Sequence, residues 1–297
     1  INVINTLTRN GFLAYLVGGG IRDLLLGMHP KDFDISTNAR PEEVVRLFKR
    51  ARVIGRRFKI AHVYFGREII EVTTFRGNHP DELDNHPHAK KSTAGQLLRD
   101  NIYGSLEEDA IRRDFTVNSL YYDFDLDQLI DYTGAFDDLK SKTLRIIGDP
   151  EKRYREDPVR MLRTIRFAAK LGFTIETRSA EPISKLAGLL LNIPPARLFD
   201  ECLKLFLSGA GERAFQLADH YQLFSHLFPD TGRHLNEDGA RQLIELALRN
   251  TDKRIAAGKG TTPAFLFAVM LWPPLQQRLV QYTDQGIRTS EALHKAK

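Results

Sequence analysis

The spacing of apolar residues changes once along the chain, and this change separates a mixed α/β part from a helical part. Up to about residue 138, short runs rich in β-branched and aromatic residues alternate with short helical segments. From about residue 154 to the end, apolar residues recur at helical spacing, so we expect helices and no strand there. The pattern predicts that a head containing both strands and helices precedes an all-helical region.

Turn and proline signals divide these parts into elements. Gly66 and Arg67 separate two strands, and glycine at the first position of a two-residue loop suits a type II′ turn, so we expect an antiparallel hairpin. Trp272 precedes two prolines, and we expect it at a helix end because proline interrupts helical hydrogen bonding. The expected strands are Ala14–Val17, Asp32–Ile35, His62–Phe65, Ile69–Phe75 and Ser119–Phe124. The expected helices are Ile21–Leu26, Pro41–Lys49, Glu107–Arg113, Arg153–Leu171, Pro194–Leu207, Ala214–Tyr221, Ala240–Arg249 and Ala264–Leu271.

Composition restricts the class of protein. The 297 residues carry a formal net charge of +5, which permits a polyanionic partner without requiring one. The single cysteine, Cys202, excludes an intrachain disulfide framework and a multi-cysteine metal site, and we expect it to be packed rather than reactive. No apolar run approaches the ~20 residues of a membrane-spanning helix, and the first residues lack the layout of a signal peptide. We therefore expect a cytoplasmic protein without a membrane segment.

A glycine-rich turn follows the first expected strand. Gly18, Gly19 and Gly20 lie between that strand and a short helix, where backbone N–H groups can point at an anion. Glycines let the backbone approach a phosphate closely, and Arg22 adds a positive guanidinium. The spacing matches neither the dinucleotide-binding glycine motif nor a P-loop. The turn therefore predicts a phosphate site, with a plain structural turn as the alternative.

Two aspartates, Asp32 and Asp34, lie two residues apart in the next expected strand. Side chains alternate across a strand, so the two carboxylates would share one side while Phe33 and Ile35 face the core. Like charges this close repel unless cations hold them, and two carboxylates with phosphate oxygens suit Mg²⁺. Such a site can stabilise the attacking and leaving oxygens of a phosphoryl transfer. The alternative is a solvated pair on an edge strand, and the preceding glycine turn argues against it.

Further charged residues could complete this site. Glu71 lies within an apolar strand, so its carboxylate is either exposed on the open face or placed beside the aspartates as a third acid. There it could accept the proton of an attacking hydroxyl or complete the ligands of a metal. Arg113 could contact the phosphate or sugar of a nucleotide, and Asp114 could lie near the metals or orient that arginine. Surface ion pairs are the alternative for this second group.

The helical region contains a basic stripe. Asp157 and Pro158 form a good N-cap and first-turn pair, and Arg160 lies three residues after Asp157. Together Asp157 and Arg160 offer an acceptor and donors to the edge of a base. Arg163 and Arg166 continue the stripe and suit a triphosphate or an RNA backbone, whereas a solvated basic face is the alternative. A separate basic cluster, suited to the phosphates of an RNA primer, comprises Arg56, Arg57 and Lys59.

These motifs have the order and spacing of a known family. The chain resembles the template-independent nucleotidyltransferases that comprise CCA-adding enzymes and bacterial poly(A) polymerases, within the polymerase β-like superfamily. The resemblance covers at least residues 12 to about 207, and Val53–His62 and Asn192–Phe199 are similar to segments of the bacterial poly(A) polymerase branch. The motifs that carry the family resemblance are Val17–Asp23, Lys31–Ile35, Arg112–Asp114 and Glu156–Arg163.

The resemblance implies a polynucleotide adenylyltransferase that transfers AMP from ATP to an RNA 3′-hydroxyl, with a role in RNA processing and decay. It implies an α+β fold with a small mixed-sheet catalytic head at residues 1–138, a helical neck that recognises the nucleotide at 139–210 and a helical body toward the RNA at 211–297. Mg²⁺ would be the cofactor, and the RNA 3′ end and the RNA-decay machinery would be partners. In this interpretation Asp32 and Asp34 hold the metal ions, and Glu71 and Asp114 assist as acids. The residues that would bind the nucleotide are Gly18, Gly19, Arg22, Arg113, Asp157, Arg160, Arg163 and Arg166.

Two other functions stay open at this point. A CCA-adding tRNA nucleotidyltransferase uses the same chemistry and shares the motifs, and CMP addition to a tRNA that lacks its terminus would identify it. A non-catalytic RNA-binding relative would keep only the scaffold, but the intact aspartate pair and the glycine turn argue against it.

Overall fold

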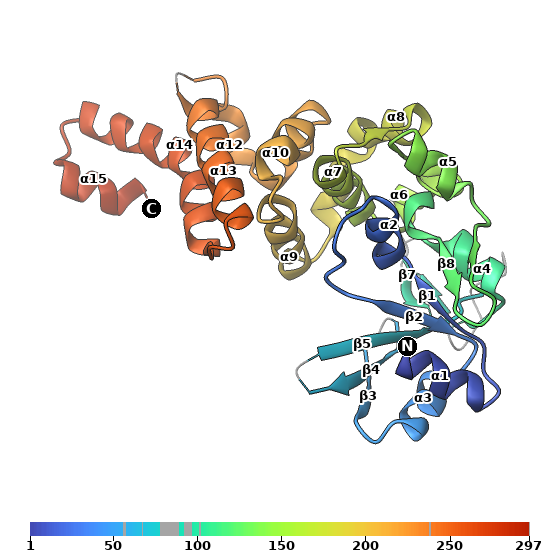
Figure 1. The fold of residues 1–297 in the computed structure, drawn as a ribbon. Coiled ribbons are helices and arrows are strands. Elements are labelled where there is room, and N and C mark those ends of the chain that lie inside the picture. The colour runs from blue at the N-terminus through green and yellow to red at the C-terminus, as the bar shows by residue number, and fades with distance from the viewer. Residues whose placement is uncertain are drawn as a thin grey trace. The chain divides into compact units, whose positions relative to one another are not determined.

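The computed structural model describes residues 1–55, 58–66, 68–77, 89–91, 97–100, 102–237 and 239–296 (Figure 1). The chain divides into two compact units. The first comprises Ile1–Asp157 together with Thr174–Ser179, and the second comprises Pro158–Phe173 together with Ala180–Lys297. The expected three-part division at residues 138 and 210 stays a prediction. In the described part of the chain, no helix combines the length and the apolar character that crossing a membrane requires.

The first unit contains a mixed sheet whose described strands have the order β3-β4-β5-β2-β1-β8-β9. Among these strands β2 and β5 run parallel, and the other neighbours run antiparallel. The α+β fold class is therefore confirmed. The seven strands are β1 (Ala14–Val17), β2 (Asp34–Thr37), β3 (Ala51–Ile54), β4 (Ile60–Phe65), β5 (Glu68–Thr74), β8 (Tyr121–Asp123) and β9 (Gln128–Ile130).

The register of the central strands aligns three positions. Asp34 in β2 pairs with Val17 in β1 on one side and with Glu71 in β5 on the other. Directly paired residues on neighbouring strands share a face of the sheet, so the side chains of Asp34 and Glu71 are neighbours. The hairpin expected at Gly66 is confirmed, because β4 and β5 pair antiparallel around it and Gly66 has a φ of 64°. Arg67 lies outside the described residues.

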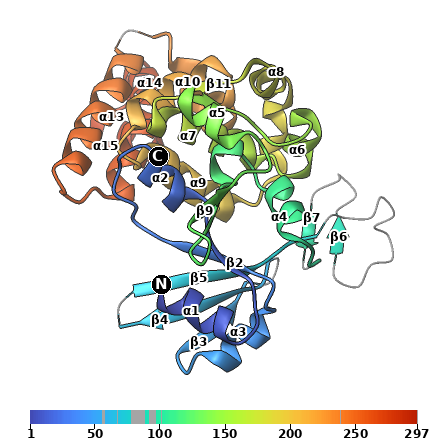
Figure 2. The same cartoon turned by 45° about the vertical axis from the view of Figure 1, so that its right-hand side comes forward.

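Helices of the first unit pack against this sheet. Helix α1 (Asn2–Arg9) and helix α3 (Pro41–Leu47) lie next to each other (Figure 1, Figure 2). Helix α4 (Leu106–Arg112) begins with a capping box, in which the backbone N–H groups of Ser105 and Glu108 donate to each other's side chains at 2.8 and 3.2 Å. The other short elements are α2 (Gly19–Leu25), β6 (Ala89–Lys91), β7 (Leu97–Asp100), the 3₁₀ helix η1 (Thr116–Asn118), α5 (Ala135–Lys140), β10 (Thr143–Leu144), α6 (Pro150–Glu156) and β11 (Thr174–Ile175).

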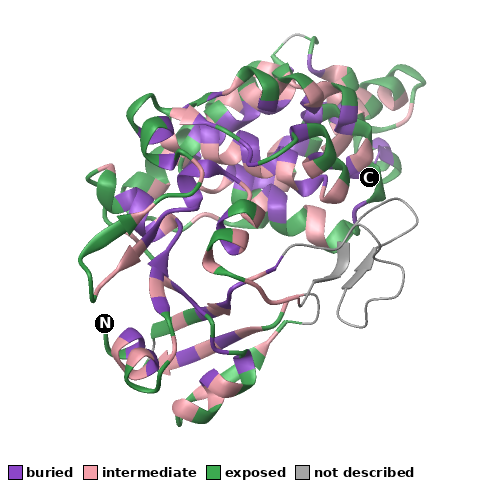
Figure 3. Cartoon of the chain, turned by 90° about the vertical axis from the view of Figure 1, so that its right-hand side faces the viewer, coloured by how far each residue is buried: buried purple, intermediate pink, exposed green. Residues whose placement is uncertain are grey.

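The second unit is helical, and its buried residues gather between the helices (Figure 3). Phe206, Phe215 and Phe224 are completely buried, and the rings of Phe215 and Phe224 meet edge to face with centroids 4.8 Å apart. Cys202 is buried as expected, and burial raises the pKa of its thiol to about 12. The helices are α7 (Val159–Leu171), α8 (Thr177–Leu186, which starts in the first unit), the 3₁₀ helix η2 (Ala187–Asn192), α9 (Pro195–Phe206), α10 (Gly211–His220), α11 (Leu223–Leu227), α12 (Pro229–His234), α13 (Ala240–Ala256), α14 (Pro263–Asp284) and α15 (Thr289–Ala296).

The single helix expected over Arg153–Leu171 is wrong. Two helices occur there, α6 and α7, and Asp157 separates them with a φ of −150° and a ψ of 93°. The ring of a proline clashes with the backbone of the preceding residue when that residue is helical. Pro158 therefore ends α6 at Glu156. Asp157 is not the N-cap either, because α7 takes Pro158 as its N-cap, without a capping side-chain hydrogen bond.

The helix end expected at Trp272 is also wrong, because α14 continues through its two internal prolines to Asp284. A proline cannot donate to the carbonyl four residues before it, so Pro274 leaves the Met270 carbonyl without its helical donor. The buried hydroxyl of Thr231 donates to that carbonyl at 2.5 Å. A side chain from another helix thus supplies the hydrogen bond that the proline removes.

Two smaller expectations are corrected. Phe33 does not face the core, because β2 begins only at Asp34 and the alternation does not extend back to Phe33, which is 40% exposed. Ile35 is buried as expected. The part expected to lack strands contains β11, which pairs in parallel with β10. A two-residue strand is too short to produce a periodic pattern in the sequence.

Candidate active site

Three carboxylates surround the start of β2. Asp34 is its first residue, Asp32 lies two residues earlier, and Glu71 is the direct neighbour of Asp34 in β5. Burial and the charges of Glu71 and Asp32 raise the pKa of Asp34 and Arg113 lowers it, which together bring it to about 6. The acids are therefore close enough to oppose one another's ionisation.

Two of these acids, Asp34 and Glu71, border a small cleft of about 120 Å³. Its other charged groups are the carboxylate of Asp109 and three arginines, whose opposite sign suits the oxygens of a phosphate. The cleft thus combines groups that attract cations with groups that attract phosphates. Its lining comprises Val17, Asp34, Glu71, Thr73, Arg76, Asp109, Arg112 and Arg113.

The donor set fits a hard divalent cation. Among the described residues, no three Asp, Glu, His or Cys side chains form a complete metal-binding group. Mg²⁺, however, is commonly bound by one or two carboxylates together with substrate phosphates. Asp32 and Asp34 offer such a pair, and a cation beside them would relieve the repulsion that raises the pKa of Asp34.

His62 on β4 faces Glu71, a contact that is not predicted from the sequence. Its Nε2 lies 3.3 Å from Glu71 Oε1, and its side chain is only 15% exposed. The two groups lie within ion-pair distance, and His62 Nε2 has no hydrogen-bond partner in the described part of the chain. A signal existed in the sequence: a two-residue loop at Gly66 fixes the antiparallel register, and that register pairs His62 with Glu71.

The glycine turn connects β1 to α2 and touches the acidic segment. Gly18 has a φ of 80° and a ψ of −134°, a conformation that favours glycine, and its N–H donates to the Leu120 carbonyl at 3.1 Å. A Cβ added to Gly20 would lie 3.2 Å from both the Asp32 carbonyl and the Phe33 ring. Gly20 therefore lets the turn and the segment that carries Asp32 approach each other closely. At Gly19 an added Cβ would lie 3.4 Å from Arg22 Nη2.

The predicted phosphate ligand Arg22 is buried, with 3% of its surface exposed. Its Nε and Nη2 donate to Asp23 Oδ1 at 2.8 and 2.6 Å, and its Nη1 donates to the Asn118 side chain. These hydrogen bonds tie α2 to η1. Arg22 thus holds the glycine turn in place in this structure, and its contact with a phosphate stays a prediction.

The guanidinium of Arg113 is held from two sides. Nη2 donates to Asp109 Oδ2 at 3.1 Å, and Nε donates to the Tyr121 hydroxyl at 3.0 Å. The Tyr121 hydroxyl donates to the same Asp109 oxygen at 2.6 Å, and the Tyr121 ring centroid lies 5.2 Å from Arg113 Cζ. Neither partner of Arg113 is predicted from the sequence. The i, i+4 spacing of Asp109 and Arg113 was the available signal.

The Asp114 carboxylate accepts hydrogen bonds from η1 and from Phe115, the residue that precedes η1. Its Oδ1 accepts from the Phe115 N–H at 2.9 Å and from the Asn118 side-chain amide at 3.3 Å. The carboxylate of Asp109, which the sequence did not indicate, contacts Arg113. The predicted location of Asp114 near the metal ions stays a prediction.

The predicted base-binding residues lie around the break between α6 and α7. Asp157 ends the first segment of the first unit, and Arg160, Arg163 and Arg166 belong to the second unit. The Cζ atoms of Arg163 and Arg166 lie 5.5 and 4.7 Å from the centroid of the Phe167 ring. This aromatic ring organises the two arginines on α7, and their contacts with a nucleotide stay predictions.

Of the basic cluster predicted to contact the RNA primer, only Lys59 lies among the described residues. Lys59 Nζ lies 2.9 Å from Glu42 Oε1, and both side chains are about half exposed. Arg56 and Arg57 lie outside the described residues. The role of the cluster therefore stays a prediction.

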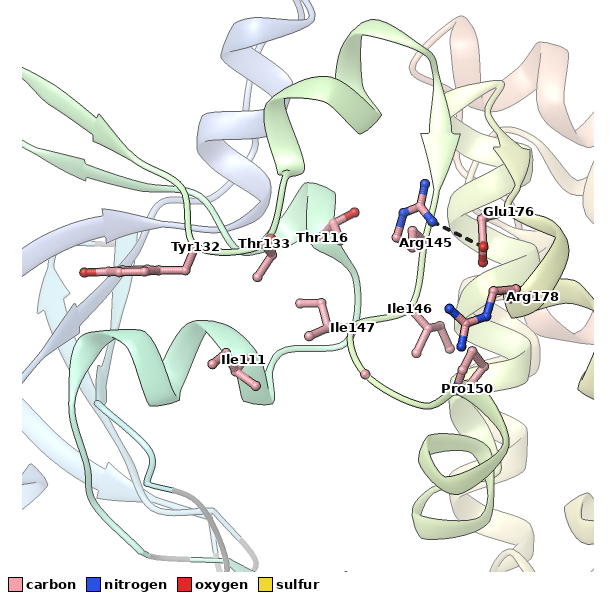
Figure 4. Close-up of a pocket in the computed structure, with 11 residues that line it drawn as sticks. Ile111, Thr116, Tyr132, Thr133, Arg145, Ile146, Ile147, Pro150, Glu176 and Arg178 are labelled. Carbon is pink, nitrogen blue, oxygen red and sulfur yellow. Dashed lines mark ion pairs between the residues drawn. The ribbon is translucent and has the colours of Figure 1, made fainter.

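A second cavity of about 230 Å³ lies in the first unit (Figure 4). Arg145 in its lining is paired with two acids, with Nη1 3.2 Å from Glu176 Oε1 and Nε 3.0 Å from Asp138 Oδ2. Ile111 and Ile147 form part of its apolar lining. The lining includes none of the residues predicted to bind nucleotide, metal or RNA. The predicted chemistry therefore belongs to the acidic cleft.

Comparisons with known proteins match both units. Residues 14–145 match the family model "Poly A polymerase head domain", and residues 172–235 match "Probable RNA and SrmB- binding site of polymerase A". The chain is 54% identical to Poly(A) polymerase I of Escherichia coli O6:H1 over 278 residues, which are 93% of this chain and 60% of that protein. It is 38% identical to the CCA-adding enzyme of Lactobacillus helveticus over 244 residues, which are 82% of this chain and 57% of that enzyme.

A solved structure has the same fold. The Bacillus stearothermophilus CCA-adding enzyme in complex with CTP matches with a TM-score of 0.67 and 26% identity, over 99% of this chain and 80% of the other. The curated relatives are longer, since this chain spans about 60% of their length. The range matched by the head model includes the glycine turn, the acids and Arg113. The chain belongs to the nucleotidyltransferase family of the poly(A) polymerases and CCA-adding enzymes.

Proposed function

We propose that the chain catalyses template-independent addition of AMP from ATP to the 3′ end of RNA. In this reaction the RNA 3′-oxygen forms a bond to the α-phosphorus of ATP, the bond between the α-phosphorus and the bridging oxygen breaks, and pyrophosphate leaves. The observation that carries the proposal is the pairing of Asp34 with Glu71 beside Arg113, next to a glycine turn. It places acids for a cation and a cationic group for phosphates in one cleft.

The acids have separate parts in this proposal. Asp32 and Asp34 would hold Mg²⁺, which when bound would neutralise charge on the phosphates and activate the attacking oxygen. Glu71 is 48% exposed at its side chain and adjoins His62, so it can accept the proton of the RNA 3′-hydroxyl. Asp114 would support the metal site from the segment after α4.

Nucleotide and RNA would be bound by the basic residues around the cleft and by α7. Backbone N–H groups of Gly18 and Gly19, with Arg22 and Arg113, would contact the triphosphate and sugar. Adenine and the remaining phosphates would be bound by Asp157, Arg160, Arg163 and Arg166. The RNA primer would be contacted by Arg56, Arg57 and Lys59.

The preference for AMP over CCA addition rests on similarity. A relative that is 54% identical is a poly(A) polymerase, whereas the CCA-adding relative is 38% identical. The segment Val53–His62 points the same way, because it is similar to that of the bacterial poly(A) polymerase branch. Contact with RNA-decay machinery stays a prediction from the family resemblance.

The test is an extension assay with each of the four nucleoside triphosphates, Mg²⁺ and an end-labelled RNA primer. We expect ladders of added A from ATP alone, and no extension by Asp34→Asn. The variant Asp125→Asn is the matched control, because Asp125 is exposed on the loop between β8 and β9. CMP addition to a tRNA that lacks its terminus would instead identify a CCA-adding enzyme. RNA binding without incorporation of any nucleotide would identify a non-catalytic relative.

A further inference from the structure

The Asp109 carboxylate is buried beside the cleft and is 4% exposed. Four donors from separate parts of the chain converge on it. Burial raises the pKa of Asp109, but the charge of Arg113 and these hydrogen bonds outweigh it and lower that pKa overall. The carboxylate therefore stays ionised and fixed. The donors are Ser36 Oγ at 3.2 Å, the Arg76 backbone N–H at 3.0 Å, Arg113 Nη2 at 3.1 Å and the Tyr121 hydroxyl at 2.6 Å.

These contacts determine how the Arg113 guanidinium is oriented. Asp109 binds Nη2 and Tyr121 binds Nε, which fixes the plane of the group. The remaining nitrogen, Nη1, lies toward the glycine turn, since a Cβ added to Gly18 would lie 3.5 Å from it. Arg113 thus presents Nη1 between the glycine turn and the acids.

An arginine in this cleft has competing partners. Asp34 and Glu71 line the same cleft as Arg113, and an arginine that loses one carboxylate turns to another within reach. An Arg113 side chain bound to these acids would occupy the place of a cation and would turn away from the glycine turn. The position of Arg113 therefore depends on the buried charge of Asp109.

We infer that Asp109 is a positioning residue, which holds Arg113 with Nη1 toward the nucleotide triphosphate and keeps it off the acids Asp34 and Glu71. This inference rests on the proposed function, because it requires a triphosphate in the cleft. Asp109 itself touches neither substrate nor metal in this proposal. Its effect passes through Arg113.

The first experiment compares Asp109→Asn with Ser36→Ala. Both changes weaken the same hydrogen-bond network, but only Asp109→Asn removes the charge that holds Arg113. We expect Asp109→Asn to lower kcat/KM for ATP by about 10- to 100-fold, mainly through a higher KM. Ser36→Ala should change it by less than about threefold. Circular dichroism and urea unfolding identify the fraction of each variant that is folded.

The second experiment is a double-mutant cycle with Arg113→Ala. If Asp109 acts through Arg113, Asp109→Asn adds no further loss once Arg113 is absent. The cycle is measured both in kcat/KM and in the dissociation constant of ATP without RNA. The dissociation constant can be obtained even for a variant with little activity. Losses that multiply, or an unchanged ATP dissociation constant in Asp109→Asn, would overturn the positioning role. If the wild-type chain adds no AMP, the proposed function fails, and the ATP-binding cycle still decides the inference.

Discussion

The substitution Asp34→Asn should affect stability and activity in opposite directions, because it removes a charge that the folded state disfavours but that the proposed reaction requires. In the folded chain burial and the charge of Glu71 raise the pKa of Asp34 from 3.8 to about 6. At neutral pH the folded state therefore carries a charge that its surroundings disfavour, and this difference in pKa corresponds to about 3 kcal/mol. We expect Asp34→Asn to abolish AMP addition and, in metal-free protein at pH 7, to raise the free energy of unfolding by up to about 3 kcal/mol.

The dependence on pH has a defined sign. Between 3.8 and about 6 the folded state binds the Asp34 proton more strongly than the unfolded state does. The contribution of Asp34 to stability therefore falls as the pH rises through this range. The advantage of Asn over Asp is complete above that range and disappears below it.

Urea unfolding with a metal chelator, at several pH values from about 4 to about 7.5, measures this difference directly. Asp125→Asn is the surface control and should change little. Glu71→Gln removes part of the same repulsion, so its gain and that of Asp34→Asn should not add. Mg²⁺ in place of the chelator should stabilise the wild type and not Asp34→Asn. A destabilised Asp34→Asn, or a gain that stays constant down to pH 4, would refute the electrostatic reasoning.

Three further changes have expected outcomes. Gly18→Ala and Gly27→Ala both place a side chain at a positive φ, and each should lower the free energy of unfolding in urea by about 1–3 kcal/mol. Only Gly18→Ala should weaken ATP binding, since an added Cβ at Gly27 meets no atom within 4 Å. Equal ATP affinities of the two variants would count against a role of the glycine turn. Thr231→Val leaves the Met270 carbonyl without a donor and should cost about 1–3 kcal/mol, whereas unchanged stability would show that the helix tolerates its prolines alone. Phe215→Ala removes a fully buried ring and should cost about 3–5 kcal/mol, and a loss below 1 kcal/mol would contradict the packing of the second unit.

The sequence predicts the local parts of this fold well, because each depends on neighbouring residues. The bounds of β1 follow from a short apolar run, and the hairpin at Gly66 follows from one turn residue. Errors arise where a distant residue decides the outcome. The helix through Pro274 is one example, since Thr231 supplies the missing donor from 43 positions earlier in the chain. No local pattern contains that contact.

Tertiary contacts also distinguish the two arginines of the candidate site, Arg22 and Arg113. From the sequence Arg22 and Arg113 are equivalent, since each lies beside an aspartate near a predicted phosphate site. In the structure Arg22 has all three guanidinium nitrogens engaged by Asp23 and Asn118, whereas Arg113 has Nε and Nη2 held and Nη1 turned toward the glycine turn. A phosphate bound at Arg22 would have to replace buried hydrogen bonds, but one bound at Arg113 would add to those already present. Arg113 is therefore the stronger candidate for the triphosphate, and this difference follows from tertiary contacts that motif spacing does not contain.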